Sequence, residues 1–79
     1  MFYTYALISN NHDRIYIGLT RNLESRIREH NAGKTKSTKY YIPWSLFYSE
    51  EFDTRLKARL REKKLKSGVG REFLKKKLR

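Results

Sequence analysis

The chain has 79 residues, among them 19 lysines and arginines, 8 acidic residues and no cysteine, which gives a formal net charge of +11. This length is enough for one small domain, and the lack of cysteine excludes disulfides and thiolate metal sites. The excess of positive charge raises the local concentration of polyanions and favours nucleic acid as a partner, although a ribosomal or a peripheral membrane protein would also explain it.

The first twenty residues predict a β-hairpin. Residues 2–9 and 14–19 are rich in apolar, aromatic and β-branched side chains, and the polar cluster from Ser9 to Asp13 is typical of a turn. The apolar start has neither a basic lead nor a small-residue cleavage site, and no apolar run approaches the ~20 residues of a membrane span. We therefore expect a soluble, cytoplasmic protein that does not associate with membranes.

The next segment predicts a helix followed by a loop. Asn22 can cap a helix that starts at Leu23, and Gly33 suits the left-handed position that closes a helix. Residues 34–39 are basic, serine and threonine residues with no apolar anchor, so we interpret them as a basic loop.

The remainder predicts one strand and two helices. Residues 44–48 have the composition of a strand, Asp53 suits the cap of a helix over about residues 54–66, and residues 70–78 can form a short last helix. The predicted fold is therefore α/β (α+β): a three-stranded, mainly antiparallel sheet flanked by helices, in the order β-β-α-β-α-α. We expect residues 1–79 to form one domain.

Two ionisable residues stand in the apolar stripe of the first predicted helix. Leu23, Arg26, Ile27 and His30 occupy positions i, i+3, i+4 and i+7, the spacing of a face that packs on a sheet. Either Arg26 and His30 line the edge of a cleft, or the helix is rotated and both face solvent. Periodicity does not decide between these alternatives.

Glu62 is the second unusual position. Residues 54–79 contain twelve lysines and arginines but only two acids, and Glu62 falls in line with the apolar Ala58 and Leu65. Taken alone, it is best explained as a surface partner of Lys66 at i+4. The functional alternative is a metal ligand, because hard divalent cations prefer carboxylate oxygen.

These positions together resemble a known family. The first strand holds Tyr3-Thr4-Tyr5, and Tyr16-Ile17-Gly18 begins eleven residues after Tyr5. Arg26 follows Tyr16 by ten residues, His30 comes four later, and the predicted helix with Glu62 follows Pro43-Trp44-Ser45-Leu46. This order resembles the GIY-YIG nuclease superfamily, especially its small single-domain bacterial type, and the catalytic domains of excision-repair and homing endonucleases.

The resemblance implies a metal-dependent endonuclease that hydrolyses DNA. It implies that Glu62 binds one divalent cation, Mg²⁺ or Mn²⁺, and that Arg26 contacts the scissile phosphate. It also implies that Tyr5 and Tyr16 position or deprotonate the attacking water and that His30 faces the site. A phenol has an ordinary pKa of about 10, so a tyrosine base needs a lowered pKa, for which the positive field here is a plausible cause. His30 could share the proton transfer.

The basic surface is expected to bind nucleic acid, most simply DNA, although RNA is not excluded. A structure-selective or weakly sequence-selective nuclease, or one that takes specificity from a protein partner, fits a module without a reading helix. The expected contacts are Lys34, Lys36, Lys39, Lys75, Lys76 and Lys77. The alternative is a catalytically inactive nucleic-acid-binding module with the same fold, since Leu19 stands where some members have a lysine and no asparagine follows Asn31.

Overall fold

The computed structural model describes residues 1–78 and confirms the predicted order of elements. The elements are β1 (Phe2–Ser9), β2 (Ile15–Thr20), α1 (Leu23–Asn31), a 3₁₀ turn η1 (Lys39–Tyr41), β3 (Trp44–Phe52), α2 (Arg55–Leu65) and α3 (Gly68–Lys77). The fold is α+β, a three-stranded antiparallel sheet with three helices among these residues. None of those helices has the length and apolarity that crossing a membrane requires.

β1 lies in the centre of the sheet, whose strand order is β2-β1-β3. It pairs antiparallel with β2, so that Tyr5 lies opposite Gly18 and Leu7 opposite Tyr16. Successive side chains of a strand point to opposite faces. One face therefore carries Tyr5, Leu7 and Tyr16, whereas Ala6 points to the other.

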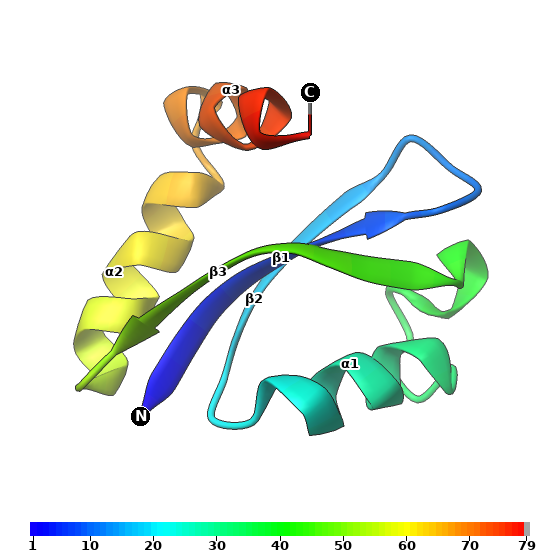
Figure 1. The fold of residues 1–79 in the computed structure, drawn as a ribbon, viewed down its shortest axis with the longest axis horizontal. Coiled ribbons are helices and arrows are strands. Elements are labelled where there is room, and N and C mark those ends of the chain that lie inside the picture. Colours follow the sequence, from blue (N-terminus) through cyan, green and yellow to red (C-terminus); the bar gives the residue numbers. More distant parts are fainter. Residues whose placement is uncertain (79) are drawn as a thin grey trace.

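The two faces of the sheet are covered by different helices. Figure 1 shows α1 on one side of the sheet and α2 with α3 on the other. On the α1 side, Tyr5, Leu7 and Trp44 form a buried cluster. On the α2 and α3 side, the buried cluster is Ala6, Ile17, Leu65 and Leu74. Full burial of a leucine stabilises the fold by about 1.5–3 kcal/mol relative to its exposure, so both clusters contribute substantially.

The sequence predicted the N-cap of α1 correctly but placed the N-cap of α2 one residue too early. The side chain of Asn22 accepts a hydrogen bond from the backbone nitrogen of Ser25 at 3.1 Å, and Gly33 has a φ of 78°, as expected for both positions. Asp53, however, is not the cap of α2. Thr54 accepts from the backbone nitrogen of Lys57 at 3.2 Å and caps the helix, while Asp53 forms an ion pair with the Lys57 side chain at 3.0 Å.

Two boundaries also differ from the sequence prediction. β3 does not end at Tyr48 but continues to Phe52, because residues 49–52 pair with the beginning of β1. α3 begins at Gly68, capped by the Ser67 side chain. A Cβ atom on Gly70 would lie 2.2 Å from the backbone oxygen of Lys64, so only glycine lets α3 start this close to the end of α2.

Candidate active site

Two tyrosines meet over a glycine on the α1 side of the sheet. Tyr5 is fully buried, and its ring centroid lies 6.2 Å from that of the half-buried Tyr16. A Cβ atom on Gly18 would lie only 2.6 Å from the Tyr5 hydroxyl oxygen and 2.9 Å from Cε2 of Tyr16. Gly18 therefore leaves the space that both rings occupy, which gives the Tyr-Ile-Gly tripeptide a structural reason.

His30 enters the same cluster from α1. It is fully buried, and its Nε2 lies 3.0 Å from the Tyr5 hydroxyl. Its ring centroid is 4.7 Å from that of Tyr16. The alternative of a rotated helix with His30 in solvent is therefore wrong. Burial and the charge of Arg26 lower the pKa of His30, which keeps the imidazole neutral near pH 7.

Arg26 lies at the rim of this cluster, one helical turn before His30. About a third of its side chain is exposed, and its NH1 is 2.8 Å from Oε1 of Glu29. Its positive charge also acts on the Tyr5 phenol, whose ionised form it favours. A guanidinium is always charged and can only donate hydrogen bonds, so Arg26 presents a fixed donor to this part of the site.

The pKa of Tyr5 moves in the opposite direction to the one expected for a tyrosine base. Burial raises it to about 12, and the opposing effect of Arg26 is smaller. The positive charge of the chain therefore does not lower the pKa of this phenol, because desolvation of the phenolate outweighs it. Tyr5 is protonated at neutral pH and can take a proton only if it gives its own away.

Glu62 approaches from α2, which packs on the other face of the sheet. Its charge is the smallest of the effects on the pKa of Tyr5, which it raises through space rather than by contact. The residue is only 7% exposed, although its Oε2 pairs with Lys66 Nζ at 3.1 Å. The predicted pair with Lys66 thus exists, but it is not a surface contact on the side of Glu62. Among the described residues, Glu62 Oε1 is buried without a hydrogen-bond partner and lies 3.5 Å from Arg59 NH1.

The carboxylate of Glu62 fits a hard cation, but the cation would not be enclosed by protein ligands alone. In residues 1–78 no group of three or more histidine, cysteine or acidic side chains converges on one point. Mg²⁺ commonly keeps several waters and takes one or two carboxylates from the protein. Glu62, with one carboxylate oxygen free of hydrogen bonds, could hold a cation in that way.

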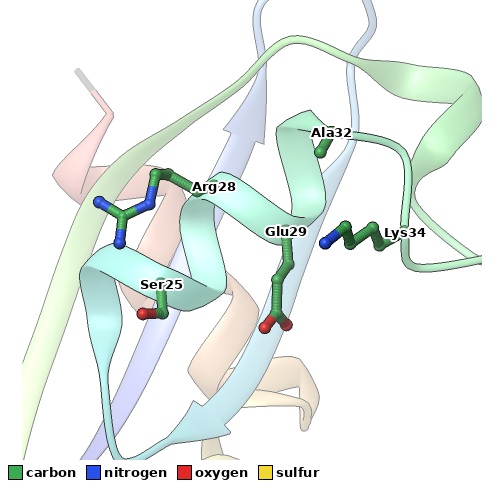
Figure 2. A pocket seen from close by; sticks show the side chains of 5 residues that line it. All are labelled: Ser25, Arg28, Glu29, Ala32 and Lys34. Carbon is green, nitrogen blue, oxygen red and sulfur yellow. The ribbon is translucent and has the colours of Figure 1, made fainter.

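The lysines expected to bind nucleic acid fall into two separate groups. Lys34 lines a pocket of about 250 Å³ on α1 with Ser25, Arg28, Glu29 and Ala32, and Lys36 and Lys39 follow it in the loop. Figure 2 shows the Lys34 and Glu29 side chains extending along the same side of that pocket. The second group, residues 75–77, lies on α3 on the opposite side of the sheet (Figure 1).

Arg28 and Thr38 were not singled out from the sequence. Arg28 belongs to the pocket beside Glu29, the partner of Arg26, which extends the basic surface next to the cluster. Thr38 lies in the loop expected to have no apolar anchor, and its anchor is polar: the residue is buried and its Oγ is 2.9 Å from Nδ1 of His30. A threonine within a polar run carries no sequence signal of such a contact.

Comparison with known families agrees with this geometry. The family model described as the GIY-YIG catalytic domain matches residues 1–77. The chain is also similar to the solution NMR structure of a UPF0213 protein from Bacillus halodurans, with a TM-score of 0.55 and 29% sequence identity, over 94% of this chain and 82% of that one.

Two further UPF0213 proteins are similar to this chain. A UPF0213 protein of Natronomonas pharaonis is 39% identical over 66 residues, which cover 82% of this chain and 76% of that protein. One of Haloquadratum walsbyi is 45% identical over 56 residues, which cover 70% of this chain and 63% of that protein. The chain thus spans somewhat less than two thirds of the Haloquadratum protein.

Proposed function

Because this chain belongs to the GIY-YIG catalytic domain family, whose nucleases act on nucleic acid, we propose that it is an endonuclease that hydrolyses phosphodiester bonds of DNA with the help of one divalent cation, Mg²⁺ or Mn²⁺. The observation that supports this most is the buried hydrogen bond of 3.0 Å between the Tyr5 phenol and the neutral imidazole of His30. Glu62, on α2, adds a buried carboxylate oxygen that has no hydrogen bond among the described residues.

Glu62 is the proposed ligand of the cation. Its buried Oε1 has no hydrogen bond among the described residues, so a cation would satisfy an atom that the fold leaves unsatisfied. When bound, such a cation supplies Lewis-acid stabilisation of the charge that develops on the phosphate and the leaving oxygen. Lys66 and Arg59 neutralise the carboxylate otherwise.

Arg26 is the proposed phosphate contact. It is partly exposed, and its positive charge acts on the Tyr5 phenol, to which the attacking water would pass its proton. Its planar donor fork matches two oxygens of a phosphate. Glu29 holds the side chain in place at 2.8 Å and leaves other N–H groups of the guanidinium for the substrate.

Tyr5 and His30 are proposed to move the proton together. As the water attacks phosphorus, its proton passes to the Tyr5 oxygen, and the Tyr5 proton passes to Nε2 of His30 over the 3.0 Å hydrogen bond. The products are a neutral phenol and an imidazolium, so a phenolate never has to form in the buried site. Tyr16, with its ring beside both, would help to position the water.

The substrate is proposed to lie on the α1 side, beside the cluster. Lys34 lines the pocket on α1, and Lys36 and Lys39 follow it in the chain, whereas residues 75–77 of α3 would need a bent or branched nucleic acid to be contacted at the same time. This arrangement favours recognition of structure over sequence, or specificity supplied by a protein partner. Phosphate contacts of this kind predict steep salt dependence.

One observation favours a second function, a catalytically inactive nucleic-acid-binding module. Glu62 is already paired with Lys66 at 3.1 Å and Arg59 at 3.5 Å, so its charge is neutralised without a metal ion. If those pairs hold in solution, the basic surface would bind nucleic acid and the cluster would have no catalytic cation.

Nicking of supercoiled and branched DNA with Mg²⁺, Mn²⁺ or EDTA distinguishes the two functions. Glu62→Gln should abolish metal-dependent nicking and retain DNA binding. Glu72→Gln is the matched control, since this glutamate on α3 is exposed and its nearest cation, Lys75, is 3.9 Å away. Binding without cleavage in the unaltered protein, with DNA and RNA substrates alike, would support the binding module. Equal cleavage by the Glu62→Gln protein would exclude Glu62 as the ligand.

A further inference from the structure

The loop between α1 and β3 reaches the cluster through one buried hydroxyl. Thr38 is 1% exposed, and its Oγ lies 2.9 Å from Nδ1 of His30. The backbone carbonyl of Thr38 accepts a hydrogen bond from Nε1 of Trp44 at 2.9 Å. The backbone is therefore held independently of the hydroxyl, so the position of Thr38 does not depend on its contact with His30.

The hydrogen bonds around Thr38 have a direction. A threonine hydroxyl has one proton, and the backbone oxygen of Thr35 accepts it at 3.4 Å. Both contacts of the Thr38 oxygen are hydrogen bonds only when it donates to Thr35 and accepts from His30, and this arrangement places the proton of the neutral ring on Nδ1. The two nitrogens of a neutral imidazole have opposite roles, so Nε2 becomes an acceptor.

The Tyr5 hydroxyl is the other partner of the imidazole, 3.0 Å from Nε2. With the proton of the neutral ring on Nδ1, Nε2 accepts from this hydroxyl, so both ring nitrogens are hydrogen-bonded. The guanidinium of Arg26, whose charge acts on the Tyr5 phenol, offers that hydroxyl no competing acceptor.

We propose that Thr38 is a positioning residue that fixes His30 as the Nδ1–H tautomer, so that Nε2 is free to accept the proton of Tyr5. This rests on the proposed nuclease function, because an acceptor at Nε2 matters to the reaction only if Tyr5 passes its proton on. The other tautomer would place a proton on Nε2 and block that transfer.

The tautomer can be read directly by long-range ¹H–¹⁵N NMR of the uniformly ¹⁵N-labelled protein at pH 8. The spectra distinguish the protonated ring nitrogen from the unprotonated one, and a His12→Gln protein assigns the signals of the exposed His12. Thr38→Val keeps the shape of the side chain and the carbonyl that Trp44 binds, but it removes the hydroxyl. Thr38→Ser keeps the hydroxyl.

The unaltered protein and Thr38→Ser should show Nδ1–H, and Thr38→Val should shift toward Nε2–H. The rate of plasmid nicking should fall about 10- to 100-fold in Thr38→Val and recover in Thr38→Ser. Nε2–H in the unaltered protein, an unchanged tautomer in Thr38→Val, or full activity after a tautomer change would each overturn the proposal.

The two proposals fail in different ways. If the unaltered protein cleaves no DNA or RNA but the tautomers behave as expected, the nuclease function is wrong and Thr38 still holds His30. Circular dichroism melting shows whether Thr38→Val folds. If it does not fold, the spectra of the unaltered protein and Thr38→Ser decide, because Nε2–H in either protein contradicts the role of Thr38.

Discussion

The two faces of the sheet use the same central strand for different chemistry. Tyr5 and Ala6 are neighbours on β1, both fully buried, yet they point to opposite faces. Ala6 packs among aliphatic side chains from β2, α2 and α3. Tyr5 instead is hydrogen-bonded to the buried imidazole of His30 and senses the positive charge of Arg26.

This difference shows how a small domain combines stability with a polar site. Burying a polar group without a partner destabilises a fold, whereas an aliphatic side chain gains free energy from burial. On the α1 side, both ring nitrogens of His30 have partners, which limits that loss. We therefore expect the α2 and α3 face to determine stability and the α1 face to determine activity.

Removal of aliphatic volume from the α2 and α3 face should have the largest effect. Leu74→Ala should lower the free energy of unfolding by about 2–5 kcal/mol, because the side chain is fully buried and its loss leaves a cavity. Urea unfolding measures the change, and Val69→Ala at an exposed position of the same helix is the control. Nicking by the folded fraction should stay unchanged; a loss there would mean that the two faces are coupled.

Tyr5→Phe should separate activity from stability. Without the hydroxyl, nicking should fall about 100-fold or more, since no group passes the proton to His30. The free energy of unfolding should fall by about 1–3 kcal/mol, because Nε2 of the buried His30 loses its partner. Tyr48→Phe makes the same change on the other face, where the hydroxyl bonds Glu50 at 2.6 Å. Similar rates for the two variants would contradict the division between the faces.

His30 should make the stability of the protein depend on pH. Its pKa is below the ordinary 6.5 in the folded state, because burial and Arg26 disfavour the charged ring. The unfolded chain therefore binds a proton first as the pH falls, and stability should decrease below about pH 6.5. Urea unfolding between pH 5 and 8 measures this slope. His30→Gln should flatten it, whereas His12→Gln, at an exposed position, should leave it intact.

The smallest effect on stability is expected at Lys66, the ion-pair partner of Glu62. Its side chain is half-exposed, so Lys66→Ala should change the free energy of unfolding by no more than about 1 kcal/mol. The affinity of Glu62 for Mn²⁺ should rise severalfold, since a competing cation 3.1 Å away is removed. Calorimetric titration of Mn²⁺ measures it, with Lys63→Ala on the same helix as the control. Equal affinities would show that Lys66 does not compete with the metal.

Features that depend on neighbours in the sequence were predictable. The cap at Asn22 and the left-handed Gly33 follow from short-range chemistry, and both are confirmed. Helical periodicity put His30 in line with Leu23 and Ile27 but left open which way that face points, and the structure shows that it points inward.

Features that depend on distant contacts were not predictable. Residues 49–52 are polar in part, and only their pairing with β1 makes them part of β3. The direction of the Tyr5 pKa shift was wrong because it depends on burial, which net charge does not reveal. At α2, Asp53 and Thr54 are both good caps, so composition could not choose between them.

Trp44 joins several of these parts. Its indole Nε1 donates to the Thr38 carbonyl, its backbone exchanges two hydrogen bonds with the Asn31 side chain, and its ring meets Tyr16 edge-on at 6.4 Å. The sequence contains one tryptophan. The intrinsic fluorescence of the protein therefore comes largely from the edge of the cluster, so its emission provides a label-free optical signal for substrate or metal arriving there.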